Sequence, residues 1–466
     1  MRSSRIKRAV MTGAVAVVIA GVAVGTALGT HHAGRSDAIR HEIWDGKAKH
    51  VIFFLGDGMG TSEITIARNY ALGADGRFAG LDALPFTGYS TTWSVQESNP
   101  SLPEYVTDSA AGATAWATGH KTSNGRLSTT AGTDKDLRTI FEIAKDHGYA
   151  TGNVSTADLT DATPAALDSH INNRGCYGPL DMSLCPQDKK SVGGLGSIAE
   201  QTTDHNVDVL LGGGKSRFDE VIPAGEPNAG KTVSQTALDR GYQIVTNRAD
   251  MLAAKPGKKL LGMFAPVNMT TEWNGALATP YPGTGPQRCN ESYHSTVAPN
   301  EPSLAEMTKA AINLLDKKGG RYGASNFFLQ VEGASIDKQD HAQDPCGQIG
   351  ETVAFDKAIQ VGLAYAKTHP DTLIIVTADH GHTSQIISGP QTASHHSPGA
   401  ISTLTTADET NMIVNYATTL SGTSQDHTGT EVPVMAQGPQ ATDVLGVTDN
   451  TDLFYLMERA LGEYGK

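Results

Sequence analysis

Carboxylate and imidazole side chains stand directly after three apolar runs of the sequence. The runs are 51–55 before Asp57, 326–331 before Glu332, and 372–377 before Asp379 and His380. Carboxylates and imidazoles bind divalent cations such as zinc and magnesium. If the runs are parallel strands, their carboxyl ends meet at one edge of a sheet, where open α/β proteins bind ligands. The residues predict a metal site there. Three unrelated turns are the alternative, because Asp is an ordinary turn residue.

Two further stretches offer metal ligands. Asp337 and His341 are four residues apart, so on a helix they would share one face and could bind one ion. His427 follows Asp426 in a polar loop. A lone histidine is more often structural, so we favour His341 and His380, which have acidic neighbours at the ends of elements.

Ser109 stands where a phosphate could bind. Asp108 and Ser109 precede an alanine-rich run that ends at Gly119, which predicts a capped helix. A helix N-terminus also attracts phosphate through its free N–H groups and its dipole. A serine hydroxyl needs a base or a metal to act as a nucleophile. The sequence has no G-x-S-x-G motif, so metal activation is favoured over a hydrolase triad.

The order of the elements predicts the fold class. Apolar runs at 51–55, 151–156, 207–211, 326–331 and 372–377 are typical of strands buried on both faces, and helical patterns such as 304–316 and 349–368 lie between them. This alternation predicts an α/β fold, a three-layer αβα sandwich around a mainly parallel sheet. We expect one domain over 47–466, with a loop-rich insertion at about 212–300.

Composition restricts the function. The chain has 466 residues, 18% of them charged, and a formal net charge of −13. Such an acidic protein is a poor candidate for binding nucleic acid or an anionic membrane. If it acts on phosphate, the positive charge must come locally, from metal ions or a placed arginine.

The N-terminus predicts export. Four basic residues precede an uncharged apolar run at 9–28. Residues 1–30 are predicted to be a signal peptide, with a retained membrane anchor as the alternative, and 31–46 a linker. We therefore expect a secreted or periplasmic protein.

The four cysteines agree with export. They allow three pairings, and free thiols or a metal site are the alternatives. No C-x-x-C spacing occurs, which argues against a cysteine metal site. The four are Cys176, Cys185, Cys289 and Cys346.

Six separated motifs resemble those of bacterial alkaline phosphatases, in the family order, from about Lys47 to the C-terminus. They are 56–60 (GDGMG), 107–111 (TDSAA), 161–164 (DATP), 331–337 (VEGASID), 377–380 (TADH) and 427–429 (HTG). The resemblance implies hydrolysis of small phosphate monoesters with broad specificity, through a phosphoserine, by a homodimer of the alkaline phosphatase-like fold.

The resemblance also assigns residues. Ser109 would be the nucleophile, Arg174 would clamp two phosphate oxygens, and Asp108 would orient Arg174. Asp161 and Lys338 match positions next to the metal ligands, and the residue types at these positions differ between families. The resemblance therefore does not predict the magnesium affinity or the pH optimum. The implied disulfides are Cys176–Cys185 and Cys289–Cys346. The implied cofactors are a zinc on Asp57, Asp379 and His380, a second zinc on Asp337, His341 and His427, and a magnesium on Asp57, Thr163 and Glu332.

The sequence also allows other functions. Residues 225–232 fit the P-loop pattern of an NTPase, but no long strand precedes them and Pro227 lies inside. A sulfatase would need a C/S-x-P-x-R motif, which Ser109 lacks. A phosphodiesterase on the same fold, a phosphatase dedicated to one metabolite, and a non-enzymatic zinc- or phosphate-binding protein are further alternatives.

Overall fold

The computed structural model describes residues 43–317 and 326–462. The signal peptide or anchor predicted at 1–30, and most of the linker predicted at 31–46, lie outside these residues. Asp45–Lys466 forms a compact unit, to which the elements below belong. Within the described ranges, no helix is both long enough and apolar enough to cross a bilayer.

The central sheet positions most of the residues predicted to do chemistry. Among the described residues it has ten strands, and β16 runs antiparallel to both of its neighbours while every other pair is parallel. In spatial order the strands are β17 (Val447–Asp449), β2 (Phe86–Thr91), β16 (Val432–Gln437), β12 (Thr372–Thr377), β1 (His50–Gly56), β11 (Phe327–Gly333), β5 (Ala150–Asp158), β6 (Val209–Gly213), β8 (Lys259–Met263) and β7 (Tyr242–Val245).

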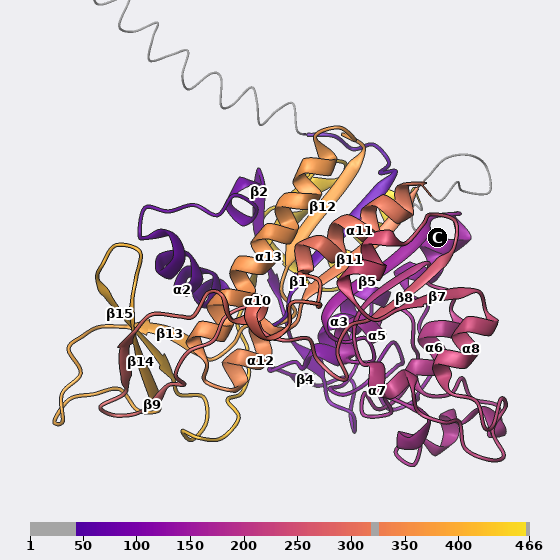
Figure 1. The fold of residues 1–466 in the computed structure, drawn as a ribbon, viewed down its shortest axis with the longest axis horizontal. Coiled ribbons are helices and arrows are strands. Elements are labelled where there is room, and N and C mark those ends of the chain that lie inside the picture. The colour runs from indigo at the N-terminus through magenta and orange to yellow at the C-terminus, as the bar shows by residue number, and fades with distance from the viewer. Residues whose placement is uncertain (1–42, 318–325, 463–466) are drawn as a thin grey trace, which may run out of the picture. The chain divides into compact units, whose positions relative to one another are not determined.

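Helices cover both faces of this sheet, which confirms the predicted three-layer α/β fold. Successive side chains of a strand point to opposite faces. In β1, Phe53 therefore packs in one core and Phe54 in the other, which explains why the strand is apolar throughout. The first core contains α3 (Ser109–Thr118), α4 (Ile140–Asp146), α5 (Ala162–Ala165), α6 (Ile198–Asp204), α7 (Lys215–Phe218), α8 (Val233–Asp239) and α14 (Asp452–Leu461). The second contains α2 (Thr61–Leu72), α9 (Arg248–Ala253), α11 (Leu304–Lys317), α12 (Ser335–His341) and α13 (Pro345–Ala366), of which α11 and α13 lie along the strands in Figure 1.

The register of the central strands aligns their carboxyl ends. Leu55 of β1 pairs with Glu332 of β11 on one side and with Thr377 of β12 on the other. Asp57 and Asp379 follow these strands by one and two residues. The residues after the three apolar runs are thus at the same edge of the sheet, as the sequence predicts.

Residues 212–300 contribute to two sheets. β7 and β8 extend the edge of the central sheet, while β9 (Thr279–Pro280) and β10 (Thr284–Gln287) join a smaller sheet with β13 (Ser384–Ile387), β14 (Ala400–Thr405) and β15 (Asn411–Tyr416). The smaller sheet lies apart from β7 and β8 in Figure 1. Cys289, just before α10 (Tyr293–Val297), is disulfide-bonded to Cys346 at the start of α13. Two short strands, β3 (Ser94–Val95) and β4 (Pro103–Glu104), pair before α3.

Candidate active site

Ser109 is the first residue of helix α3, as predicted. The Asp108 side chain caps the helix by accepting a hydrogen bond from the Ala111 N–H at 2.9 Å. Gly119 ends it in the left-handed conformation, with φ 74°. The hydroxyl of Ser109 is buried, and its Oγ lies 3.5 Å from Asp57 Oδ1 and 3.4 Å from His380 Nε2. The helix therefore places a hydroxyl against ligand-type side chains from two strand ends.

Asp57, Asp379 and His380 form the first ligand group, beside Ser109. His380 Nε2 is 3.4 Å from Asp57 Oδ1 and 3.1 Å from Asp379 Oδ2. Backbone N–H groups of Gly58 and His380 donate to Asp379 Oδ1, while Asp379 Oδ2 has no hydrogen-bond partner although it is buried. Burial, with Asp379 and other acids nearby, raises the pKa of Asp57 well above its usual value. Buried acids this close together are costly unless a cation accompanies them, so the donor set fits a metal ion.

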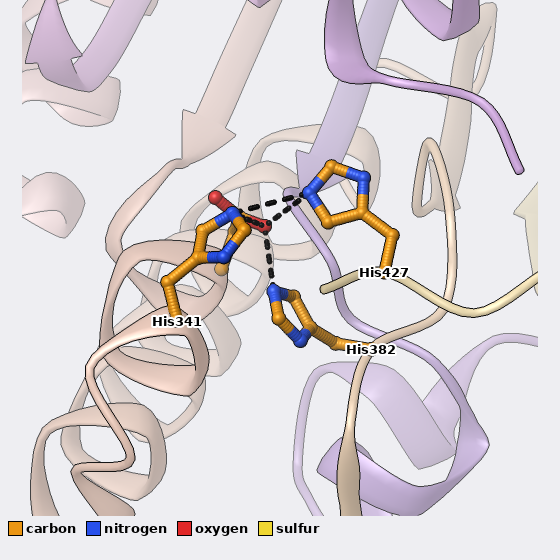
Figure 2. Close-up of side chains that lie close together, drawn as sticks. His341, His382 and His427 are labelled. Atoms are coloured by element: carbon orange, nitrogen blue, oxygen red, sulfur yellow. Dashed lines mark hydrogen bonds and ion pairs between the residues drawn. The ribbon is translucent and has the colours of Figure 1, made fainter. Parts of the chain in front are cut away.

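Asp337, His341 and His427 form the second group, together with His382. The three Nε2 atoms lie 3.1–3.3 Å from Asp337 Oδ1, and Figure 2 shows the rings converging on this oxygen. Despite these short distances, Asp337 Oδ1 makes no hydrogen bond of good geometry. His427 Nε2 and His341 Nε2 also face each other at 3.1 Å. The ligand atoms of Asp337, His341 and His427 lie together, as is typical of metal ligands, so this donor set fits zinc.

Backbone carbonyls fix the ring orientation of His341 and His427. His341 Nδ1 is hydrogen-bonded to the Gln425 carbonyl, and His427 Nδ1 to the Thr107 carbonyl at 3.0 Å. A carbonyl oxygen only accepts, so each Nδ1 carries a proton, and each Nε2 of a neutral ring presents a lone pair. Metal-binding histidines are commonly held in this way.

His382 is a site residue that the sequence analysis did not predict. Its Nδ1 accepts a hydrogen bond from the Thr383 N–H at 2.8 Å, so in the neutral ring the proton is on Nε2, which faces Asp337. His382 is therefore better suited to orient Asp337 than to bind a metal. The available signal was its place two residues after His380, in the run Asp-His-Gly-His.

Glu332 and Thr163, the other two predicted metal ligands, are both buried. Ser155 of β5 donates a hydrogen bond to Glu332, and burial raises the pKa of Glu332 to about 8. The Thr163 hydroxyl is buried without a hydrogen-bond partner. Glu332 lies close enough to Asp57 to raise the pKa of Asp57 further. Oxygen atoms without sufficient partners fit a hard cation such as magnesium. Ser155, inside a strand, was not predicted as a site residue.

Arg174 and Lys338 bring positive charge to the same region. Arg174 pairs with Asp108 at 3.1 Å and with Asp161 at 2.8 Å, and Lys338 pairs with the other oxygen of Asp161 at 2.7 Å. Burial alone would raise the pKa of Asp161, but these two cations lower it below its usual value. The network holds the guanidinium in a fixed orientation, in a cavity of about 670 Å³ that Ser109, Asp337, His341 and His427 also line.

The other predicted features are also placed. Cys176 and Cys185 form a disulfide directly after Arg174, so both disulfide pairings implied by the family resemblance are confirmed. The P-loop-like residues 225–232 follow helix α7 instead of a strand, and Lys231 is ion-paired with Asp239. They therefore lack the structural context of a nucleotide-binding loop.

Comparison with known proteins identifies the family. The family model described as alkaline phosphatase matches residues 48–421 and 404–463. Streptomycin-6-phosphate phosphatase of Streptomyces griseus is 51% identical over 89% of this chain and 91% of that protein. Alkaline phosphatase of Escherichia coli K12 is 49% identical over 91% and 88%.

The solved structures agree. The structure of alkaline phosphatase from the Antarctic bacterium TAB5 has a TM-score of 0.66 and 26% identity, and the match covers 89% of this chain and 98% of that one. Because relatives that are about half identical in sequence match most of this chain, the chain belongs to the alkaline phosphatase family of phosphomonoesterases.

Proposed function

We propose that this phosphomonoesterase works through a phosphoserine at Ser109, at a site that binds two zinc ions and one magnesium ion. The observation that carries the proposal is the position of Ser109 Oγ, at the N-terminus of α3 and within 3.5 Å of Asp57 and His380. Asp57, Asp379 and His380 would hold one zinc, and Asp337, His341 and His427 the other. Asp57, Thr163 and Glu332 would hold the magnesium.

The protein's own groups account for substrate binding. The planar guanidinium of Arg174 can donate to two phosphate oxygens at once, which a lysine cannot do. Asp108 and Asp161 hold the guanidinium in place, so little conformational freedom is lost when phosphate binds. Free N–H groups at the start of α3 also favour an anion next to Ser109.

The reaction is two displacements at phosphorus. Ser109 Oγ gives up its proton to solvent and attacks phosphorus, the ester P–O bond breaks, and the leaving alkoxide takes a proton from water to form the alcohol. Water then attacks the phosphoserine, the Ser109 Oγ–P bond breaks, and inorganic phosphate is released as Ser109 regains its proton. Zinc bound at the two groups would supply the positive charge that lowers the pKa of the Ser109 hydroxyl and stabilises the leaving oxygen.

The test combines chelation with trapping. Dialysis against a chelator should abolish hydrolysis of a chromogenic monoester, and zinc with magnesium should restore it. Protein quenched in acid during turnover should carry one phosphate, which peptide mass spectrometry should locate at Ser109. Full activity after exhaustive chelation, or a phosphate at another residue, would contradict the proposal.

A phosphatase dedicated to one metabolite is the second candidate, because the Streptomyces griseus relative at 51% identity is named for streptomycin 6-phosphate. The chemistry would be the same, so kcat/KM must be compared across streptomycin 6-phosphate, simple sugar phosphates and aryl phosphates. Similar values across the panel support broad specificity, and one dominant substrate supports the dedicated enzyme.

We also propose export and a homodimer. Two disulfides are consistent with an oxidising compartment. Fractionation of cells and the mass of the native protein in solution test these two proposals.

A further inference from the structure

Three ligand-type side chains meet away from Ser109, where three elements come together. Glu142 lies on α4, His170 in the segment between α5 and Cys176, and His205 is the C-cap residue of α6. One ligand-type atom of each lies within 4.8 Å of the others. His170 Nε2 is 3.4 Å from Glu142 Oε1, and the two imidazole rings are edge to face with centroids 5.7 Å apart.

Backbone carbonyls set the tautomer of both rings. His170 Nδ1 is hydrogen-bonded to the Ser128 carbonyl at 3.0 Å, and His205 Nδ1 to the Asp168 carbonyl. Each Nδ1 must therefore carry a proton, because the carbonyl can only accept. Each Nε2 of a neutral ring then presents a lone pair. The proposed zinc ligands His341 and His427 are held in the same way.

The carboxylate of Glu142 is also held in place. Its Oε2 accepts a hydrogen bond from the Thr139 N–H at 2.8 Å, within the capping box of α4. Its Oε1 lies 3.4 Å from His170 Nε2, and in the neutral ring that nitrogen presents a lone pair. Two acceptors in this arrangement repel each other unless a proton or a cation lies between them. Ligands about 2.1 Å from a tetrahedral zinc are roughly 3.4 Å apart, so the spacing of this pair already suits zinc.

Burial and charge agree with a cation. The His170 side chain is 5% exposed and the Glu142 side chain 34%, so the group is enclosed but open to solvent on one side. Burial would raise the pKa of Glu142, but His170 and the Thr139 N–H lower it to about 2, so the carboxylate is ionised at neutral pH. Asp136 and Asp204 add negative charge near His170 and His205. Lys145 lies on the same helix as Glu142, and its ammonium donates to the Asn206 carbonyl.

We propose that Glu142, His170 and His205 bind one zinc ion, with water as the fourth ligand, at a site separate from the catalytic one. Two imidazoles and a carboxylate are a donor set that zinc takes, whereas magnesium and calcium prefer oxygen ligands. For all three side chains to bind one ion, the His205 side chain must move closer to those of Glu142 and His170. Bound zinc joins α4, α6 and the segment that leads to Arg174, so its main effect is on stability.

The experiment counts zinc and uses matched variants. Full-length protein, its Glu142→Gln and His205→Ala variants, and a His395→Ala control are equilibrated with a series of zinc concentrations at fixed magnesium. Gln at position 142 can still accept the Thr139 N–H, so the helix cap is retained. His395 is an exposed histidine between β13 and β14 of the smaller sheet.

At saturation, we expect Glu142→Gln and His205→Ala to bind one zinc per chain fewer than the unchanged protein and His395→Ala, or to bind that zinc more than tenfold more weakly. The zinc-dependent rise in melting temperature should shrink in the same two variants. All four proteins should melt cooperatively in chelator, which excludes misfolding. Because the comparison measures the difference in zinc content between the proteins, it is valid whatever number of zinc ions the catalytic site binds.

The result that overturns the proposal is equal zinc binding and an equal zinc-dependent rise in all four proteins. A proton shared between Glu142 and His170 would then account for their contact. Phosphatase activity is not the quantity measured in this experiment. A negative result for this zinc site would therefore not affect the proposed catalytic mechanism.

Discussion

The guanidinium of Arg174 is ion-paired with Asp108, the residue directly before Ser109, with Nη1 3.1 Å from Oδ2. The same Oδ2 accepts a hydrogen bond from the backbone N–H of Gly125, and the backbone N–H of Arg174 donates to the Gly125 carbonyl. Asp108 therefore caps the helix of Ser109 and orients Arg174 at once. Its two contacts fix the position of Ser109, the proposed nucleophile, relative to the group that would bind phosphate.

Arg174→Ala should weaken phosphate binding by about 2–4 kcal/mol, on the scale of a lost charged donor to an oxyanion. Arg174→Lys should recover only part of this loss, because lysine keeps the charge but not the planar pair of donors. The measurement is the inhibition constant of inorganic phosphate. Arg138→Ala, which removes an exposed arginine paired with Asp146, is the control. Equal inhibition constants in all variants would show that Arg174 does not bind phosphate.

Ser109→Ala should lower kcat by at least roughly 10³-fold, since loss of a nucleophile removes the covalent route. The variant should retain its metal content, because no proposed ligand is changed. Single-turnover kinetics and metal analysis measure the two quantities, with the exposed Ser183→Ala as the control. Loss of zinc together with activity would mean that Ser109 acts on the metal site instead.

His382→Ala should lower zinc affinity at the Asp337 group by about 10–100-fold, as expected when a group that orients a ligand is removed. His382→Gln should lose less, because its amide can still donate toward Asp337. Zinc release to a competing chelator measures the effect, and His120→Ala, at an exposed histidine, controls for general loss of stability. Unchanged zinc release in His382→Ala would rule out this role.

Glu351→Gln should stabilise the fold at alkaline pH. Burial, with Glu272 nearby, raises the pKa of Glu351 to about 8. An acid whose pKa is higher in the folded state than in the unfolded state destabilises the fold as pH rises. The destabilisation develops between the pKa of the unfolded state and the pKa of the folded state. The gain should therefore be small at pH 5 and reach a few kcal/mol at pH 8, since each pKa unit is about 1.4 kcal/mol.

The Glu351 prediction is measured by urea unfolding at a fixed free-metal concentration. Gln can still accept the Glu272 N–H that Glu351 Oε1 accepts at 2.8 Å. Glu291→Gln, at an exposed position, should show no such dependence on pH. A gain that is the same at pH 5 and pH 8 would mean that ionisation of Glu351 is not the cause.

Residues next to strand ends could be predicted from the sequence, and residues that depend on tertiary contacts could not. The apolar runs before Asp57, Glu332 and Asp379 indicate buried strands, and parallel strands must bring their carboxyl ends together. Asp108 and Gly119 mark the helix of Ser109 because caps have a local sequence signal.

His382 and Ser155 show where such prediction fails. The role of His382 depends on the Thr383 N–H and on Asp337, which lies 45 residues away in the sequence. Ser155 lies inside β5, where nothing in the sequence marks a polar residue as a partner of Glu332. The group of Glu142, His170 and His205 likewise draws one residue from each of three separate elements.

The pairing of Leu55 with Glu332 and Thr377 links folding to cofactor uptake. A shift of one residue between β1 and β11 would displace Glu332 by about 3.3 Å and turn its side chain to the opposite face. Chains with slipped strands would then lack part of the ligand set. Because ions that bind only the correctly aligned sheet stabilise that alignment, metal present during refolding would select against slipped chains.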